Sequence, residues 1–75
     1  MISASEAKAE ATGFSDLRDT CEEKIEEQAE SGGMSAVIMG YTDIASEAVA
    51  KELVDELREN GYEAYVEGVN LFIQW

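Results

Sequence analysis

The sequence contains no histidine, which removes the commonest general base, the Ser–His and Cys–His nucleophile pairs, and most zinc and iron sites. Its one cysteine, Cys21, excludes a disulfide within the chain and a cysteine-rich zinc site. The pair Gly32-Gly33 follows an expected helix, whereas phosphate-binding loops and dinucleotide fingerprints follow a strand. A chain of 75 residues also has little room for a substrate cleft. We therefore expect no enzymatic activity, catalytic residue, cofactor or metal.

Basic residues are also scarce, because five Lys and Arg stand against 17 Asp and Glu, for a net charge of −12. Nucleic acid and anionic lipid would repel such a chain. The N-terminus has neither a basic region nor an apolar stretch, and the apolar run 36–41 is far shorter than the ~20 residues of a membrane helix. We expect no direct binding to nucleic acid or membranes. The acidity itself has three open explanations: solubility, adaptation to a salty environment, or imitation of a polyanion.

The N-terminal part of the chain is predicted to be helical. Ser3 to Glu6 forms a capping box, which opens an alanine-rich helix to about Thr12. Gly13-Phe14 then either kinks this helix or separates it from a second one, which Gly32-Gly33 ends. The apolar residues of the second segment recur at every fourth position and form one narrow stripe: Leu17, Cys21, Ile25 and Ala29. We expect Cys21 to be a buried, unreactive thiol, because acidic neighbours disfavour its thiolate.

The rest of the chain alternates strands with one long helix. Residues 34–41 predict a strand that is apolar on both faces. Thr42 or Asp43 is expected to cap a helix that ends at Asn60-Gly61. Residues 62–67 and 71–75 predict a hairpin around a glycine-containing turn.

This order, α-β-α-β-β, predicts an α+β fold in which residues 1–75 form a single domain. We expect a two-layer sandwich, with a three-stranded mixed sheet and helices packed on one face. The first strand and the strand after the long helix should be parallel through a right-handed crossover, and the last strand should run antiparallel. Whether the last strand lies in the middle or at the edge of the sheet is open.

The far face of this sheet is the first candidate binding surface. If Ala64, Val66, Leu71 and Ile73 face the helices, Tyr65 and Phe72 point away with Glu63 and Gln74, and Tyr41 or Met39 could lie beside them. The chain leaves no third layer to cover the aromatic pair, unless the N-terminal segment folds over it. An exposed aromatic patch with a polar rim indicates binding to a protein partner or self-association. Trp75 would be either an anchor of this surface or a cap on the core.

The second candidate surface is an acidic helix face made by Glu22, Glu23, Glu26, Glu27 and Glu30. This stretch spans about 12 Å at ~1.5 Å per residue. Duplex DNA presents roughly seven phosphates over that length, at one per ~1.7 Å. The comparable density allows the hypothesis of a nucleic-acid mimic that inhibits a host DNA- or RNA-binding protein. The alternative is an ordinary solvated helix face.

Several short motifs together resemble a loose group of very small proteins of tailed bacteriophages. They are the start Met-Ile-Ser-Ala-x-Glu-Ala (1–7), an acidic helix ending in Ser-Gly-Gly, Leu-x-x-Asn-Gly-Tyr-x-x-x-Val (57–66), and the ending Leu-x-Ile-x-Trp (71–75). The group typically ends in Ile-Ser-Trp, and here Gln74 replaces the serine. The resemblance implies a viral protein in the host cytoplasm or the virion, either a minor virion-associated component or a protein that engages a host factor. It transfers no functional residues.

Overall fold

The computed structural model describes residues 1–8 and 10–75 with their side chains. Within them the chain forms three helices, α1 (Ala4–Thr12), α2 (Phe14–Glu30) and α3 (Glu47–Glu59). A short 3-10 helix, η1 (Tyr41–Asp43), precedes α3. The three strands are β1 (Ser35–Ile38), β2 (Glu63–Glu67) and β3 (Asn70–Gln74). The α+β class and the predicted order of elements are confirmed.

The sheet has the strand order β1-β3-β2, and both pairings are antiparallel. β1 and β2 run in the same direction, as expected for a helical crossover, but β3 lies between them. The prediction of a mixed sheet is therefore wrong, and the sheet is antiparallel throughout. The physical reason is the hairpin, which returns β3 into the gap that the crossover leaves between β1 and β2. This also decides the position of the last strand, which the sequence left open.

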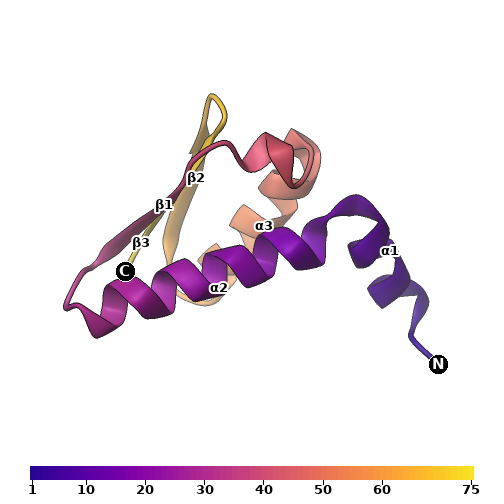
Figure 1. Ribbon diagram of the computed structural model, residues 1–75, viewed down its shortest axis with the longest axis horizontal. Coiled ribbons are helices and arrows are strands. Elements are labelled where there is room, and N and C mark those ends of the chain that lie inside the picture. The colour runs from indigo at the N-terminus through magenta and orange to yellow at the C-terminus, as the bar shows by residue number, and fades with distance from the viewer.

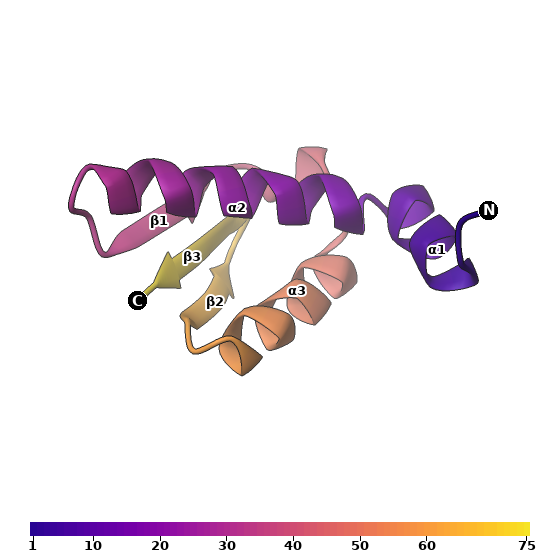
Figure 2. The same cartoon turned by 90° about the horizontal axis from the view of Figure 1, so that it is seen from below.

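Both long helices pack on the same face of the sheet, α2 over the β1 side and α3 over the β2 side (Figure 1; Figure 2). Their shared core includes Leu17 and Leu53 from the helices and Leu71 and Ile73 from β3, each at most 1% exposed. The face of α3 predicted to be apolar is buried as expected: Val49, Ala50, Leu53, Val54 and Leu57. The two-layer arrangement is thus confirmed, and no helix among the described residues covers the other face of the sheet.

Helices α1 and α2 are separate, which decides the second open question. Gly13 ends α1 in the left-handed conformation, with a φ of 79°. A Cβ atom at this position would collide with the carbonyl oxygen of Ile44. The joint between the helices therefore lies tightly against the loop that leads into α3. The predicted cap at Ser3 is confirmed, since its Oγ accepts a hydrogen bond from the Glu6 amide at 3.1 Å.

The segment before α3 differs from the expectation. Its N-cap is Ser46, whose Oγ accepts from the Val49 amide at 3.3 Å, and neither Thr42 nor Asp43 has this role. The chain turns at Gly40 (φ 68°) into η1, and this turn drives Tyr41 into the core at 1% exposure. The Tyr41 amide donates to the Val69 carbonyl at 2.9 Å. The suggestion that Tyr41 lies on the open sheet face is therefore wrong.

Candidate protein-binding surface

The face of the sheet away from the helices carries an apolar row across all three strands. The register places Val37 of β1 beside Phe72 of β3, and Phe72 beside Tyr65 of β2. The Tyr65 and Phe72 rings stack with centroids 5.0 Å apart and an interplanar angle of 16°. Tyr65 is 44% exposed and Val37 39% exposed. We call Val37, Phe72 and Tyr65 the open-face row; the prediction that Tyr65 and Phe72 face away from the helices is confirmed.

Polar residues border the open-face row on both sides. Ser35, Gln74 and Glu63 form the next row across the strands toward one end of the sheet. Toward the other end, Glu67 of β2 pairs with Asn70 of β3. An apolar centre with a polar rim is the arrangement typical of protein interfaces.

The N-terminal segment does not cover this surface. Helix α1 lies at the far end of α2 from the sheet, with the N-terminus pointing away from the body (Figure 1; Figure 2). The alternative in which this segment folds over the open-face row is therefore wrong. Gly13 explains why the N-terminal segment lies elsewhere, because the left-handed turn at this residue directs α1 away from the part of α2 that packs on the sheet.

Trp75 belongs to the core side of the sheet and not to the open-face row. Its ring packs edge-to-face on Tyr62, at 6.1 Å and 86°, and it is half-buried against the core. The Trp75 amide donates to the Met34 carbonyl at 3.0 Å, which extends the pairing of β3 with β1. Of the two roles that the sequence allowed for Trp75, the structure has the core cap.

Sequence reasoning missed Val37 as a member of the surface. The signal was present, because a strand that is apolar on both faces must leave one apolar face open when helices cover only the other. Met39, which was expected to lie near the patch, is 77% exposed just beyond the end of β1.

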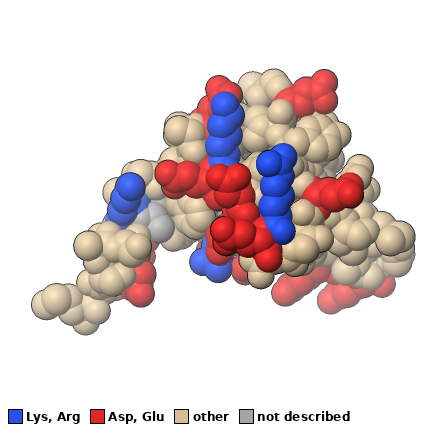
Figure 3. Space-filling model, turned by 180° about the vertical axis from the view of Figure 1, so that it is seen from behind, with Lys and Arg blue, Asp and Glu red and all other residues tan. Residues whose placement is uncertain are grey.

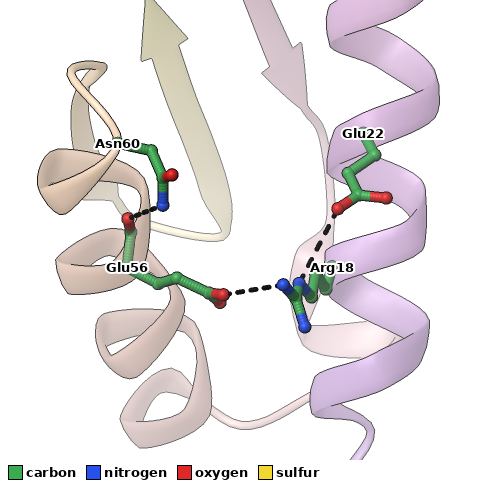
Figure 4. A network of polar contacts seen from close by, with 4 residues as sticks. All are labelled: Arg18, Glu22, Glu56 and Asn60. Carbon is green, nitrogen blue, oxygen red and sulfur yellow. Dashed lines mark hydrogen bonds and ion pairs between the residues drawn. The ribbon is translucent and has the colours of Figure 1, made fainter.

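The acidic face of α2 is solvated as a whole. Its five glutamates, Glu22, Glu23, Glu26, Glu27 and Glu30, are all exposed. Arg18 pairs with Glu22 at 3.7 Å and, across the helix pair, with Glu56 of α3 at 2.9 Å (Figure 4). Acidic side chains also gather on the opposite side of the molecule, with basic side chains between them (Figure 3). Negative charge is therefore spread over both sides of the helical layer.

A small cleft of about 260 Å³ lies between α2 and α3, lined in part by Arg18, Cys21, Glu56 and Tyr62. Burial, together with the charge of Glu22, raises the pKa of the Cys21 thiol to about 12. The thiol is therefore protonated at neutral pH, and Cys21 is 1% exposed, as the sequence predicted. Glu56 Oε1 is held by Arg18, while the buried Oε2 atom has no hydrogen-bond partner. This cleft thus combines a protonated thiol with a carboxylate that is ion-paired with Arg18, and neither is an activated nucleophile.

Within residues 1–8 and 10–75, no group of three or more histidine, cysteine, aspartate or glutamate side chains is arranged so that it could hold a metal ion. None of the helices in the part of the chain that the structure describes is long and apolar enough to cross a membrane.

Comparison of the chain with protein-family models, with curated proteins and with solved structures finds no match.

Proposed function

We propose that this protein is a non-enzymatic interaction protein that binds a protein partner or a second copy of itself. The observation that supports this function is the open-face row of Val37, Phe72 and Tyr65, which is apolar, spans three strands and is not covered by any other described part of the chain. Stacked aromatic side chains supply a large contact area with few rotatable bonds, so little entropy is lost when they are ordered. Apolar burial contributes about 25 cal/mol per Å², so covering the row with the apolar surface of a partner would stabilise the complex.

The biological setting is proposed from the motif resemblance alone. The start 1–7, the Asn-Gly-Tyr after the long helix and the Leu-x-Ile-x-Trp ending support a small tailed-bacteriophage protein. Such a protein would act in the host cytoplasm or as a minor component of the virion. A role in assembly fits a chain whose surface offers the apolar open-face row.

A nucleic-acid mimic is the second candidate, and one specific observation favours it. Among the described residues, no ion pair involves Glu23, Glu26, Glu27 or Glu30 of α2, and all four are exposed. Four unpaired carboxylates on one helix can imitate phosphate charge toward a basic host protein. Binding of that kind depends on long-range charge and is screened over a Debye length of about 8 Å at physiological ionic strength.

Affinity capture from a lysate of the native host, with stepwise salt elution and mass spectrometry, tests both candidates. We expect capture that survives high salt and is lost in the Tyr65→Ala/Phe72→Ala variant. The matched control is Ile2→Ala/Val69→Ala, which removes two exposed apolar side chains outside the row. Circular dichroism must show that each variant is folded. Capture that is unchanged in the aromatic variant would overturn the open-face proposal.

The mimic is tested in the same experiment by replacing Glu23, Glu26, Glu27 and Glu30 with glutamine. Its control removes four exposed carboxylates elsewhere, by Glu10→Gln, Glu52→Gln, Asp55→Asn and Glu59→Gln. A mimic loses its partner at moderate salt and in the α2 variant but not in the control variant. Equal losses in the two variants would indicate an effect of net charge and contradict a specific mimic.

A further inference from the structure

The two edges of the sheet are protected to different degrees. At the β2 edge, Arg58 of α3 donates from Nε and Nη2 to the Ala64 carbonyl oxygen, at 3.1 and 2.9 Å. β2 also carries Glu63 and Glu67, and charged residues on an edge strand discourage pairing with another chain. The β1 edge has neither feature. Residues 31–42 contain no charged side chain at all.

The register shows which backbone groups of β1 are left open. The Trp75 amide donates to the Met34 carbonyl, so the backbone of Met34 points toward β3. Alternation along the strand then directs Ala36 and Ile38 to β3 as well, and directs the amides and carbonyls of Ser35 and Val37 outward. These groups form a short template for another strand.

The strand at this edge and the turns on either side of it are uncharged. A groove of about 750 Å³ follows β1 beside α2, and its one charged lining residue among those that the structure describes is Lys24. Exposed apolar side chains border the edge: Met34 is 68% exposed, Val37 39% and Met39 77%. The β1 edge is therefore open and apolar, and it is uncharged from residue 31 to residue 42, with Asp43 as the first carboxylate beyond it, in a chain of net charge −12.

We propose that the β1 edge pairs antiparallel with the β1 edge of a second copy, which joins the two sheets into one of six strands. A two-fold axis places Val37 opposite Val37 of the second copy, and Ser35 opposite Met39. In this dimer the open-face rows of the two copies join through Val37 into one continuous row. The binding role of that row rests on the proposed function. The acidic β2 strands then lie at the two outer edges of the combined sheet.

Charge favours a second copy as the occupant. Two chains of net charge −12 repel each other least where the contacting strands carry no charge, and β1 with its flanking residues 31–42 meets this condition in both copies. A basic partner would be drawn to the glutamates of α2 instead, and a nucleic acid would be repelled. The contact area of one short strand and its groove is small, so we expect a dissociation constant on the order of 10 μM.

Sedimentation equilibrium of the purified protein, over a range of concentrations and salt, tests the dimer. We expect a monomer–dimer equilibrium that tightens as salt rises from about 0.1 M to about 1 M, because the Debye length falls from about 10 Å to about 3 Å and screens the repulsion. Ser35→Pro removes a backbone N–H that points away from β3, so it takes a donor from the dimer contact and leaves the hydrogen bonds to β3 intact. Met39→Lys places a charge in the contact between the two β1 strands. Each should weaken the dimer at least tenfold. Val69→Lys, at an exposed residue in the β2–β3 turn, is the matched control and should leave the dimer unchanged.

A crosslinking experiment keeps the inference testable if either variant folds poorly. In a Cys21→Ala background, Val37→Cys should form a disulfide-linked dimer on mild oxidation, whereas Val69→Cys should not. A monomer at every concentration, or equal crosslinking at both positions, would overturn the inference. So would a dimer that is lost in Tyr65→Ala/Phe72→Ala but kept in both edge variants. Because these measurements use the purified protein alone, their failure leaves the capture from lysate, and with it the proposed function, to be judged separately.

Discussion

Arg58 of α3 closes one edge of the sheet by donating two hydrogen bonds, from Nε and Nη2, to the carbonyl oxygen of Ala64 in β2. We expect Arg58→Ala to lower the free energy of unfolding by about 1 kcal/mol. The two charge-assisted hydrogen bonds are lost, but water can hydrogen-bond to the Ala64 carbonyl in their place and offsets part of the loss. Arg58→Lys should recover less than half of the loss, since an ammonium group cannot reproduce the planar fork. Urea denaturation measures both. Full recovery by lysine would show that charge alone, and not the paired geometry, is responsible.

The Arg18–Glu56 pair joins α2 to α3 at 2.9 Å (Figure 4), with the side chain of Glu56 31% exposed. We expect a double-mutant cycle with Arg18→Ala and Glu56→Ala to give a coupling energy of about 1 kcal/mol. The exposed pair Lys51–Glu47, at 3.2 Å on α3, is the control and should give about 0.3 kcal/mol. Equal couplings in the two cycles would mean that the contact between helices adds nothing beyond a surface ion pair.

Gly13 combines a positive φ of 79° with a close approach to the Ile44 carbonyl. We expect Gly13→Ala to destabilise the protein by about 2 kcal/mol or more, through backbone strain and the collision. Gly32→Ala separates the two causes, because Gly32 has a φ of 82° and open space around its Cβ position. It should cost only about 1 kcal/mol. Equal losses in thermal unfolding would contradict a steric role for Ile44.

The raised pKa of Cys21 makes stability fall at alkaline pH. The folded-state pKa of about 12 exceeds the ordinary value of 9.0, mainly because of burial. The unfolded chain therefore loses its thiol proton first as pH rises. The contribution of the buried Cys21 thiol to the free energy of unfolding is fully present below pH about 9. It is lost progressively toward pH about 12, by at most about 1.4 kcal/mol per pH unit. The measurement is the slope of the unfolding free energy against pH, between pH 8 and 11, for the wild type and for Cys21→Ala. The Cys21→Ala variant should have the shallower decline, and identical slopes would contradict the assignment.

Local sequence patterns were sufficient for most of the elements. The spacing of Val49, Leu53 and Leu57 predicted the buried face of α3, and the alternation around Tyr65 and Phe72 predicted which side of the sheet they occupy. These features depend on the spacing and polarity of residues that are close in the sequence, and both are the same wherever the segment lies in the fold. The low reactivity of Cys21 followed in the same way, from its place in an apolar stripe beside acidic residues.

Contacts between distant segments decided the rest. The sequence could not place β3 between β1 and β2, because strand order depends on how the hairpin returns after the crossover. Local sequence patterns also could not predict the burial of Tyr41, because it depends on the turn at Gly40 and on the hydrogen bond from the Tyr41 amide to the Val69 carbonyl. The direction of α1 was likewise undetermined, since it depends on a Gly13 joint that fits against Ile44, far along the chain. Composition and periodicity thus determined the elements and their apolar faces, whereas packing between remote segments determined which face and which edge of the sheet stayed open.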